Sequence, residues 1–288
     1  MRDGFLVGLI GSGIGPSLSP ALHEREANEL GLPYRYLRWD LEELGERPDA
    51  IGELLARARE RGYRGLNITH PCKRSVLEHL DEISPDAAAL GAVNTVVFEA
   101  GRTTGHNTDH SGFARSFRRG LPGVPLDRVV LLGAGGAGAA VAHALLGLGV
   151  GALRVFDAEA ERADALVAAL RERFGDRAEA GRDLPAELAG ADGLVHATPT
   201  GMAAHPGLPV PTRSLNPRMW VTDVVYRPLR TELVVTARER GCRVLDGGGM
   251  AVFQAAGSFE LFTGVEPDVE RMLGHFAELE REDAHVGG

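Results

Sequence analysis

The hydrophobic and polar positions along this chain alternate between two patterns. Short apolar runs bounded by glycine, proline or charged residues predict strands at residues 4–11, 34–41, 65–68 and 92–99. Helices are predicted at residues 20–31, 49–61, 73–80, 85–91 and 105–120, and Ser84 ahead of Pro85 fits the N-cap of one of them. Strands and helices in this order are typical of an α/β fold.

The pattern becomes more regular after the turn "LPGVPLD". From there strands and helices alternate strictly, so we place the main domain change near residue 105. A length of 288 residues supports two cores, because one domain usually spans about 150 residues. We therefore expect an N-terminal α/β domain over residues 1–105 and a second domain over residues 106–247.

Composition narrows the class of protein. The net charge is −9, and the basic residues are scattered singly or in pairs such as Arg118 and Arg119. Binding to a phosphate backbone needs a concentrated basic face, so nucleic acid and anionic membrane surfaces are poor partners. No stretch approaches the apolar length of a membrane span, and the N-terminal apolar run of about six residues is too short for a signal peptide.

Cysteine and histidine usage adds two expectations. Cys72 and Cys242 lie far apart and neither belongs to a CxxC pair, so we expect a cytoplasmic protein with both thiols reduced. The histidines form no HExxH motif and no paired ligand spacing, so we expect no dedicated metal site.

The best-defined local motif is "RVVLLGAGGAGAAVAHALLGLG". A strand at 129–132 is followed by Gly133, Gly135 and Gly138 in GxGxxG spacing and then by an alanine-rich helix. These glycines allow a tight turn, close approach of the backbone to a pyrophosphate and close packing of helix on strand. The motif predicts a Rossmann-type, doubly wound dinucleotide-binding domain. A glycine-rich turn that binds nothing, or the similar turn of S-adenosylmethionine methyltransferases, stays open as an alternative.

The next stretch, "LRVFDAEAER" (153–162), starts as an apolar strand that runs directly into an acid, Asp157, and Glu159 follows two positions later. In a dinucleotide-binding fold the tip of this strand faces the adenosine ribose. A carboxylate there accepts hydrogen bonds from the ribose hydroxyls of NAD but repels the 2′-phosphate of NADP, so we expect NAD. Arg162, one helical turn further, could either partly restore NADP binding or serve only the surface.

Polar residues gather at the ends of the predicted N-terminal strands. They form "PSLSP" (16–20), "NITHPCK" (67–73), "GAVNT" (91–95) and "GHNTDHSG" (105–112). Polar side chains at strand ends beside a nucleotide-binding domain indicate a substrate site. Together they resemble the SxSP, NxTxPxK, GAVNT and NTD motifs of the shikimate dehydrogenase family. Downstream, "ATPTGM" (197–202), "DVVY" (223–226) and "GGGMAVFQA" (247–255) are similar to its ATPxGM, DxxY and GxxMLxxQA motifs.

The resemblance implies a two-domain dehydrogenase of aromatic amino acid biosynthesis, in which the C-terminal helices at 248–288 pack back on the N-terminal domain. It implies reversible oxidation of shikimate to 3-dehydroshikimate by NAD, with Lys73 and Asp109 as the acid/base pair. The implied substrate-binding residues are Ser17, Ser19, Asn67, Thr69, Asn94, Tyr226 and Gln254. The implied cofactor-binding residues are Gly133, Ala134, Gly135, Gly136, Ala137, Gly138, Asp157, Thr198, Met202, Val225, Gly247 and Met250.

Several of these residues also have a purely structural explanation. Ser19 ahead of Pro20 fits a helix N-cap, and Asp109 could cap the helix that follows it. Asn67, Thr69 and Asn94 could close turns, and Tyr226 could pack its ring.

Lys73 and Gln254 are harder to explain without a ligand. A cation is unfavourable at a helix N-terminus, where we expect Lys73, and Gln254 lies in an otherwise apolar helical stretch. His196 stands where the family more often has Asn, and we assign it no role.

Alternatives remain for the activity. A quinate or amino-cyclitol dehydrogenase of the same family would use a similar site, and a methyltransferase or a non-catalytic nucleotide sensor lies outside the family. Family members that also take quinate tend to carry Thr at the position of Ser19, which favours shikimate here. We expect a small-molecule substrate and a monomer or homodimer.

Overall fold

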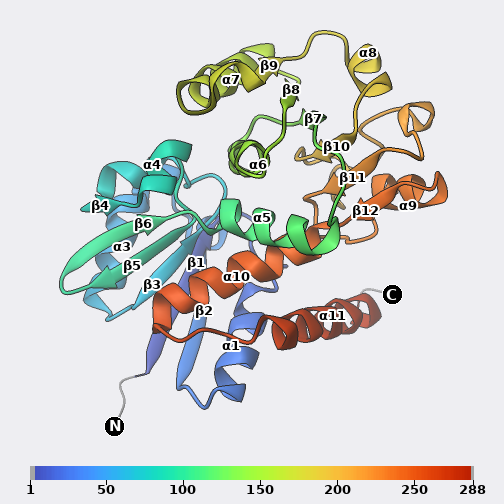
Figure 1. Cartoon of the computed structure of the whole chain (residues 1–288). Coiled ribbons are helices and arrows are strands. Elements are labelled where there is room, and N and C mark those ends of the chain that lie inside the picture. The colour runs from blue at the N-terminus through green and yellow to red at the C-terminus, as the bar shows by residue number, and fades with distance from the viewer. Residues whose placement is uncertain (1–3, 287–288) are drawn as a thin grey trace. The chain divides into compact units, whose positions relative to one another are not determined.

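The structure is a computed structural model that describes residues 4–286, with side chains up to Glu282. Contacts divide the chain into two compact units (Figure 1). The first unit comprises the residues up to Thr108 together with those from Val252 onward, and the second comprises Asp109–Ala251. Each unit has its own six-stranded sheet, so the predicted α/β fold class is confirmed.

The first unit is built on a mixed sheet. Its strands are β1 (Phe5–Gly11), β2 (Tyr34–Asp40), β3 (Gly65–Ile68), β4 (Glu82–Ile83), β5 (Thr95–Glu99) and β6 (Arg102–His106). Its helices and 3-10 turns are α1 (Ser19–Glu29), α2 (Leu41–Leu44), η1 (Pro48–Ala50), α3 (Ile51–Glu60), η2 (Ser75–His79), α4 (Pro85–Leu90) and α11 (Val269–Val286). The strand order is β2-β1-β3-β5-β6-β4, and β5 runs antiparallel to both of its neighbours.

The second unit contains a parallel sheet of the predicted doubly wound type. Its strands are β7 (Arg128–Leu132), β8 (Ala152–Phe156), β9 (Ala178–Ala180), β10 (Gly193–His196), β11 (Trp220–Asp223) and β12 (Arg243–Leu245). Its helices and 3-10 turns are α6 (Gly136–Gly147), α7 (Ala160–Phe174), η3 (Gly175–Arg177), α8 (Leu184–Ala189), η4 (Thr212–Ser214) and α9 (Glu232–Glu239). The order β12-β11-β10-β7-β8-β9 reverses between β7 and β10, the point where such folds bind dinucleotides.

Two helices cross the boundary between the units. Helix α5 (Thr108–Gly120) begins with the last residue of the first unit, and α10 (Gly247–Thr263) ends in the first unit. The later part of α10 packs on the first sheet, where a Cβ added to Gly65 would lie 2.3 Å from the ring of Phe262. Gly65 therefore allows the helix to approach the strand closely.

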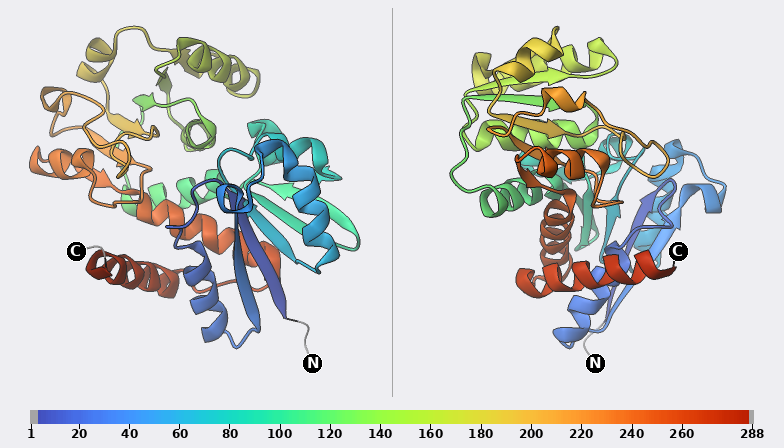
Figure 2. Two further views of the ribbon diagram at one scale, coloured as in Figure 1. Left: turned by 180° about the vertical axis from the view of Figure 1, so that it is seen from behind. Right: turned by 90° about the vertical axis from the view of Figure 1, so that its right-hand side faces the viewer.

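Helix α11 is fastened to α1, and the two helices are in contact (Figure 2). The fully buried carboxylate of Glu26 accepts two hydrogen bonds from Arg271, at 2.6 and 2.9 Å, and a third from the backbone N–H of Asp268. A buried carboxylate needs such partners, and this bidentate pair raises the pKa of the Arg271 guanidinium.

The sequence-based helix and strand predictions were wrong in two places. Residues 105 and 106, predicted as helical, belong to β6, which pairs with β5 across a two-residue turn. That turn needs positive φ angles, which Ala100 and Gly101 adopt at 49° and 80°, a hairpin pattern that the polar stretch "GRTTGH" obscured. Residues 73–80 form only a 3-10 turn at Ser75–His79, so Lys73 precedes the helical segment rather than lying in its first turn.

Other local predictions agree with the structure. Ser84 is the N-cap of α4, and its side chain accepts a hydrogen bond from the backbone N–H of Ala87. Cys72 and Cys242 are free and buried. Within residues 4–286, no helix combines the length and the apolar character needed to cross a membrane.

A fully buried imidazole lies in the core of the first unit. His23 packs against the rings of Tyr34, Tyr36, Phe259 and Phe262, and its Nδ1 atom lies 2.9 Å from the hydroxyl of Tyr34. Burial lowers the pKa of His23 from 6.5 to about 3, because a charged imidazole would lose its hydration there. The folded protein therefore holds His23 neutral at moderately acidic pH.

The buried His23 predicts that the folded protein becomes less stable at acidic pH. Below pH 6.5 the unfolded chain binds a proton at this imidazole that the folded chain does not, so stability falls as the pH decreases. The loss from one such group is up to about 1.4 kcal/mol per pH unit, and we expect His23→Gln to remove that part of the slope. Urea unfolding between pH 7 and 4 measures it. The exposed His79→Gln is the control, and equal slopes in the wild type and His23→Gln would contradict the assignment.

Candidate active site

The loop after β1, which carries Ser17 and Ser19, is anchored by the end of β2. Asp40, the last residue of β2, is 5% exposed and accepts hydrogen bonds from the backbone N–H groups of Gly13 at 3.1 Å and Ile14 at 2.8 Å. It also accepts one from Glu42 N, and Arg38 of the same strand donates to Gly15 O. No sequence motif indicates this role of Asp40.

The two serines do not behave as predicted at the start of α1. The N-cap residue is Leu18, which makes no side-chain cap, and Ser19 is the first helical residue. Instead the Ser17 hydroxyl accepts a hydrogen bond from Ser19 N at 3.3 Å. The N-cap explanation for Ser19 is therefore wrong, because the helix begins one residue earlier than Pro20 suggested.

A buried network joins Asn67 of β3 to the segment before β5. The Asn67 carbonyl oxygen accepts from the Tyr36 hydroxyl at 2.8 Å, and its amide donates to Thr95 Oγ1 at 3.1 Å. The Asn94 carbonyl oxygen accepts from Thr108 N at 2.8 Å. These bonds leave each amide only one orientation, so the network positions both side chains before any ligand arrives.

Hydrogen bonds to backbone carbonyl groups bring three of the polar motifs together. Val93 N donates to Lys73 O at 2.8 Å, and the Asn107 side chain donates to Ala92 O at 3.0 Å. Thr69 N donates to Ile10 O, and a Cβ on Gly11 would lie 2.3 Å from the Thr69 methyl group. Motifs that lie up to 40 residues apart in the chain therefore meet at one end of the first sheet.

The remaining candidates lie on both units. Asp109 follows Thr108 directly, is buried, and lies in the first turn of α5. Gln254 lies on α10 in the first unit, one turn before Gly257, whose added Cβ would lie 3.3 Å from the Thr108 methyl group. Tyr226 follows β11 in the second unit.

Lys73 has a further property that its motif does not reveal. It is the only lysine in the sequence, where every other strongly basic side chain is Arg. A guanidinium stays protonated under all ordinary conditions, whereas an ammonium can give up its proton. The neighbouring Cys72 is an unsuitable nucleophile, because burial raises the pKa of its thiol.

The glycine turn has the geometry that a pyrophosphate requires. A Cβ on Gly138 would lie 2.0 Å from Gly133 O, and one on Gly133 would lie 2.5 Å from Ala197 O, so both positions are too tight for a side chain. A Cβ on Gly135 would meet nothing within 4 Å. The turn is therefore closed toward the protein and open on its outer side at Gly135, where α6 begins and backbone N–H groups can approach an anion.

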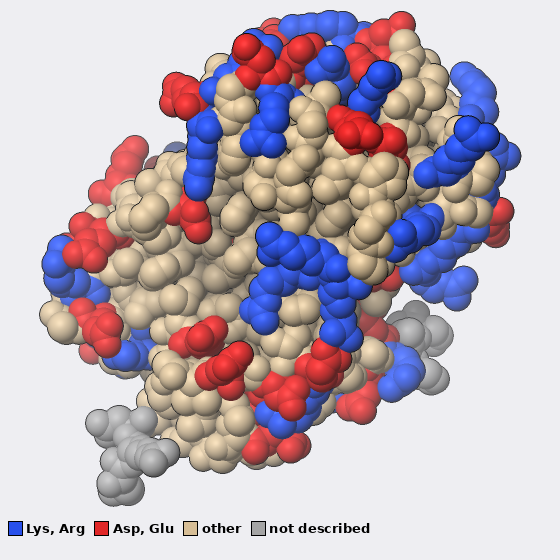
Figure 3. All heavy atoms as spheres, in the orientation of Figure 1, with Lys and Arg blue, Asp and Glu red and all other residues tan. Residues whose placement is uncertain are grey.

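Asp157 lies at the tip of β8 and is tied to this turn. Its Oδ2 atom accepts from Ala134 N at 2.7 Å, and its Oδ1 atom accepts from Glu159 N at 3.0 Å. Arg162, the cation that could attract a 2′-phosphate, instead pairs with Glu159 at 2.8 Å. The face seen in Figure 3 carries side chains of both charge signs.

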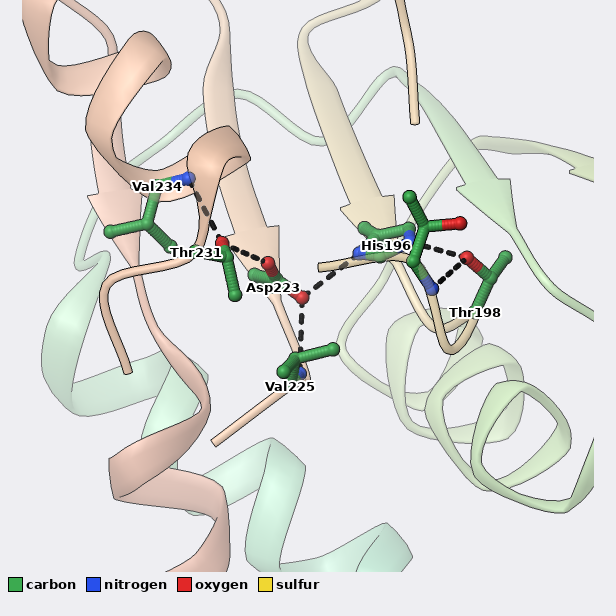
Figure 4. A network of polar contacts seen from close by, with 7 residues as sticks. His196, Thr198, Asp223, Val225, Thr231 and Val234 are labelled. Carbon is green, nitrogen blue, oxygen red and sulfur yellow. Dashed lines mark hydrogen bonds and ion pairs between the residues drawn. The ribbon is translucent and has the colours of Figure 1, made fainter. Parts of the chain in front are cut away.

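The ends of β10 and β11 are joined by a buried polar network (Figure 4). His196 has no exposed surface and lies 2.9 Å from Asp223 Oδ1 through Nδ1 and 2.5 Å from Thr198 Oγ1 through Nε2. Asp223 also accepts from Val225 N at 3.0 Å and from the Thr231 hydroxyl at 2.6 Å. Thr198 and Val225, both cofactor candidates, thus belong to one network. His196, to which the sequence analysis assigned no role, lies at its centre.

The other cofactor candidates differ in their surroundings. Gly247 approaches the segment after β11 closely, since an added Cβ would lie 2.6 Å from Val225 O. Met250 packs against the core of the second unit, whereas Met202 is 43% exposed. Among the described residues, no group of three or more His, Cys, Asp or Glu side chains could hold a metal ion.

The strand order, the open glycine turn and the acid at the tip of β8 define a dinucleotide-binding α/β protein. Family models agree: "Shikimate dehydrogenase substrate binding domain" matches residues 9–96, and "Shikimate 5'-dehydrogenase C-terminal domain" matches residues 247–274. The chain belongs to the shikimate dehydrogenase family. It is an oxidoreductase of the shikimate/quinate dehydrogenase type that works with a nicotinamide dinucleotide, which decides against the methyltransferase alternative.

Individual relatives cover almost the whole chain. A "Shikimate dehydrogenase (NADP(+))" of Streptomyces avermitilis is 64% identical over 96% of this chain and 97% of its own length. A "Quinate/shikimate dehydrogenase (NAD(+))" of Corynebacterium efficiens is 50% identical over 96% of this chain and 99% of its own. The solved quinate dehydrogenase of Corynebacterium glutamicum in complex with NAD has a TM-score of 0.91 and 47% identity, covering 96% of this chain and 100% of that one.

The anchoring role of Asp40 leads to a prediction. Asp40→Ala removes the acceptor for Gly13 N and Ile14 N, so the loop with Ser17 and Ser19 should lose its fixed position. We expect KM for the organic substrate, shikimate or quinate, to rise about tenfold while kcat changes less than about threefold, since candidate substrate-binding residues move and the candidate acid/base residues do not. Steady-state kinetics measures both. The exposed Asp49→Ala is the control, and an unchanged KM in Asp40→Ala would contradict the role.

Proposed function

We propose that this protein catalyses the reversible oxidation of shikimate to 3-dehydroshikimate with NAD. The observation that carries the proposal is the network of Asn67, Asn94 and Thr108, which joins three of the family's substrate motifs at one end of the first sheet. In this proposal the first unit binds shikimate and the second binds the dinucleotide. The match of a substrate-binding family model to residues 9–96 supports that division.

The proposed acid/base pair is Lys73 and Asp109. When bound, the nicotinamide supplies the acceptor for the hydride. The ammonium of Lys73, beside the reacting oxygen, stabilises its alkoxide character and exchanges its proton, while Asp109 orients the ammonium and shares the proton. The single lysine supports this assignment, because an Arg could supply charge but could not exchange a proton.

The proposed substrate contacts are neutral. Ser17, Ser19, Asn67, Thr69, Asn94, Tyr226 and Gln254 offer the donors and acceptors that a polyhydroxylated carboxylate needs. A site with fixed amides rejects an analogue whose groups leave those amides unpaired. We propose shikimate as the better substrate and quinate, suggested by the names of the Corynebacterium relatives, as the weaker one, because Ser19 stands where quinate-using members tend to carry Thr.

The preference for NAD rests on charge at the tip of β8. Two unit charges about 4 Å apart repel by ~4 kcal/mol at an effective dielectric of about 20, whereas a hydrogen bond to a charged group gains about 1.5–3 kcal/mol. A 2′-phosphate beside Asp157 would meet this repulsion, and the pairing of Arg162 with Glu159 reduces the compensation. The ribose hydroxyls of NAD would instead donate to Asp157, whose oxygens retain lone pairs beyond those used by Ala134 N and Glu159 N.

We further propose that the protein acts in the cytoplasm as a monomer or homodimer. The two free cysteines support a reducing compartment.

The proposed function predicts the order of kcat/KM in four assays. With shikimate or quinate as substrate and NAD or NADP as cofactor, kcat/KM should be highest for shikimate with NAD. We expect NAD to exceed NADP by at least ~100-fold, on the order of 3 kcal/mol. Absorbance at 340 nm measures all four. A higher value for quinate would overturn the substrate choice, and equal or better use of NADP would overturn the cofactor choice.

Asp157→Asn tests the cause of that preference. It keeps an oxygen for Ala134 N but removes the charge, so the NAD preference should fall by about tenfold or more. Asp176→Asn is the matched control, because its side chain is 97% exposed in the same unit. An unchanged preference in Asp157→Asn would show that another group selects the cofactor.

The acid/base pair predicts a loss of turnover rather than of binding. Lys73→Ala and Asp109→Asn should each lower kcat by about 10²–10⁴-fold with little change in KM, and the double variant should be little worse than either. Lys73→Arg should stay inactive although it keeps the charge. The exposed neighbour Arg74→Ala serves as control. Near-normal kcat with a raised KM in Lys73→Ala would remove Lys73 from the chemistry.

A further inference from the structure

The network at the ends of β10 and β11 contains an imidazole that the proposed chemistry does not use. His196 and Asp223 are both fully buried, and His196 lies between Asp223 and Thr198 (Figure 4). The Asp223 carboxylate has three partners, His196 Nδ1, Val225 N and the Thr231 hydroxyl. A buried group with this many fixed contacts has a defined rotamer.

The donors and acceptors in this network can be assigned from chemistry. An ionised carboxylate only accepts hydrogen bonds, so His196 Nδ1 donates to Asp223. On a neutral imidazole Nε2 then carries no hydrogen and accepts, so the Thr198 hydroxyl donates to it. Thr200 N donates to Thr198 Oγ1 at 3.3 Å. A hydroxyl has one hydrogen and two lone pairs, so Thr198 retains one lone pair for a ligand.

Thr198 also lies where a dinucleotide is expected. β10 and β7 flank the reversal of strand order, and the segment after β10 touches the turn after β7. A Cβ on Gly133 would lie 3.2 Å from the Thr198 methyl group, so the Thr198 side chain lies beside the glycine turn. The fixed lone pair of Thr198 is therefore presented beside the open turn.

We propose that His196 is a positioning residue for the cofactor. Held by Asp223, it directs the Thr198 hydroxyl proton inward, so that Thr198 offers the bound dinucleotide only an acceptor. The cofactor group that meets Thr198 is then a neutral donor, either the amino group of the nicotinamide carboxamide or a ribose hydroxyl. This inference rests on the proposed dinucleotide site, and it adds a residue to which neither the family motifs nor the reaction assigns a role.

Two substitutions at His196 separate positioning from simple structural support. His196→Asn can still reach Asp223 but not Thr198, whereas His196→Gln extends an amide toward the place of Nε2. We expect His196→Asn and Thr198→Val each to weaken NADH binding by about tenfold, and His196→Gln and Thr198→Ser to stay within about threefold of the wild type. Fluorescence titration with NADH measures the dissociation constant without turnover.

A double-mutant cycle gives the sharper test. If His196 acts through Thr198, adding Thr198→Val to His196→Asn should weaken NADH binding by less than about twofold more. Fully additive losses, equal losses in His196→Asn and His196→Gln, or no loss in Thr198→Val would each overturn the proposal. Thr198 is partly exposed, so its variants keep the test valid even if substitution of the buried His196 prevents folding.

The identity of the donor and the cofactor choice are tested separately. The reduced 3-acetylpyridine analogue lacks the carboxamide amino group, so Thr198→Val should leave its affinity unchanged if that group is the donor and weaken it if a ribose hydroxyl is. Either result supports the proposal. Titration of the wild type with NADH and NADPH tests the cofactor choice alone, and if NADPH binds more tightly the cycle is run with NADPH.

Discussion

In both units, an aspartate at the carboxyl end of one parallel strand holds the end of the neighbouring strand or the segment that follows it. Asp40 after β2 binds the loop after β1, Asp157 after β8 binds the turn after β7, and Asp223 at the end of β11 binds His196 at the end of β10. Parallel strands leave backbone N–H groups and loops at the same edge, and a carboxylate there satisfies buried donors that would otherwise cost free energy. These three contacts fix the loop that carries Ser17 and Ser19, the glycine turn, and the imidazole that bonds Thr198.

The buried polar network of the first unit fixes two amide side chains, Asn67 and Asn94, through their hydrogen bonds. Asn67 and Asn94 are buried among β3, β5 and the start of α5, and each is held by hydroxyl or backbone groups. Fixed amides lose little further entropy when a ligand binds, and they discriminate between ligands because they cannot turn to suit a different pattern of hydroxyls. A rigid network of this kind therefore presents one fixed set of donors and acceptors at the end of β3.

Much of this arrangement could be predicted from local sequence. The glycine turn, Asp157, the motif order and the bounds of β3 follow from patterns within a few residues, and they agree with the structure. Asp40 and Tyr36 act on residues 26 to 31 positions away, so no local pattern reveals them. The role of His196 depends on which strand lies beside β10, and β6 was missed because its turn at Ala100 and Gly101 is not a common hairpin sequence. The fact that Lys73 is the only lysine can be read from the sequence alone.

The contact between Asp157 and Ala134 N couples the charge at the tip of β8 to the shape of the glycine turn. The same carboxylate that would meet the adenosine ribose also fixes the backbone of the glycine turn. A basic side chain at position 157 would leave Ala134 N without its acceptor, whereas Asn would keep that acceptor and remove only the charge. A basic residue at this position would therefore have to come with a new acceptor for Ala134 N, so the charge beside the ribose site and the shape of the glycine turn change together.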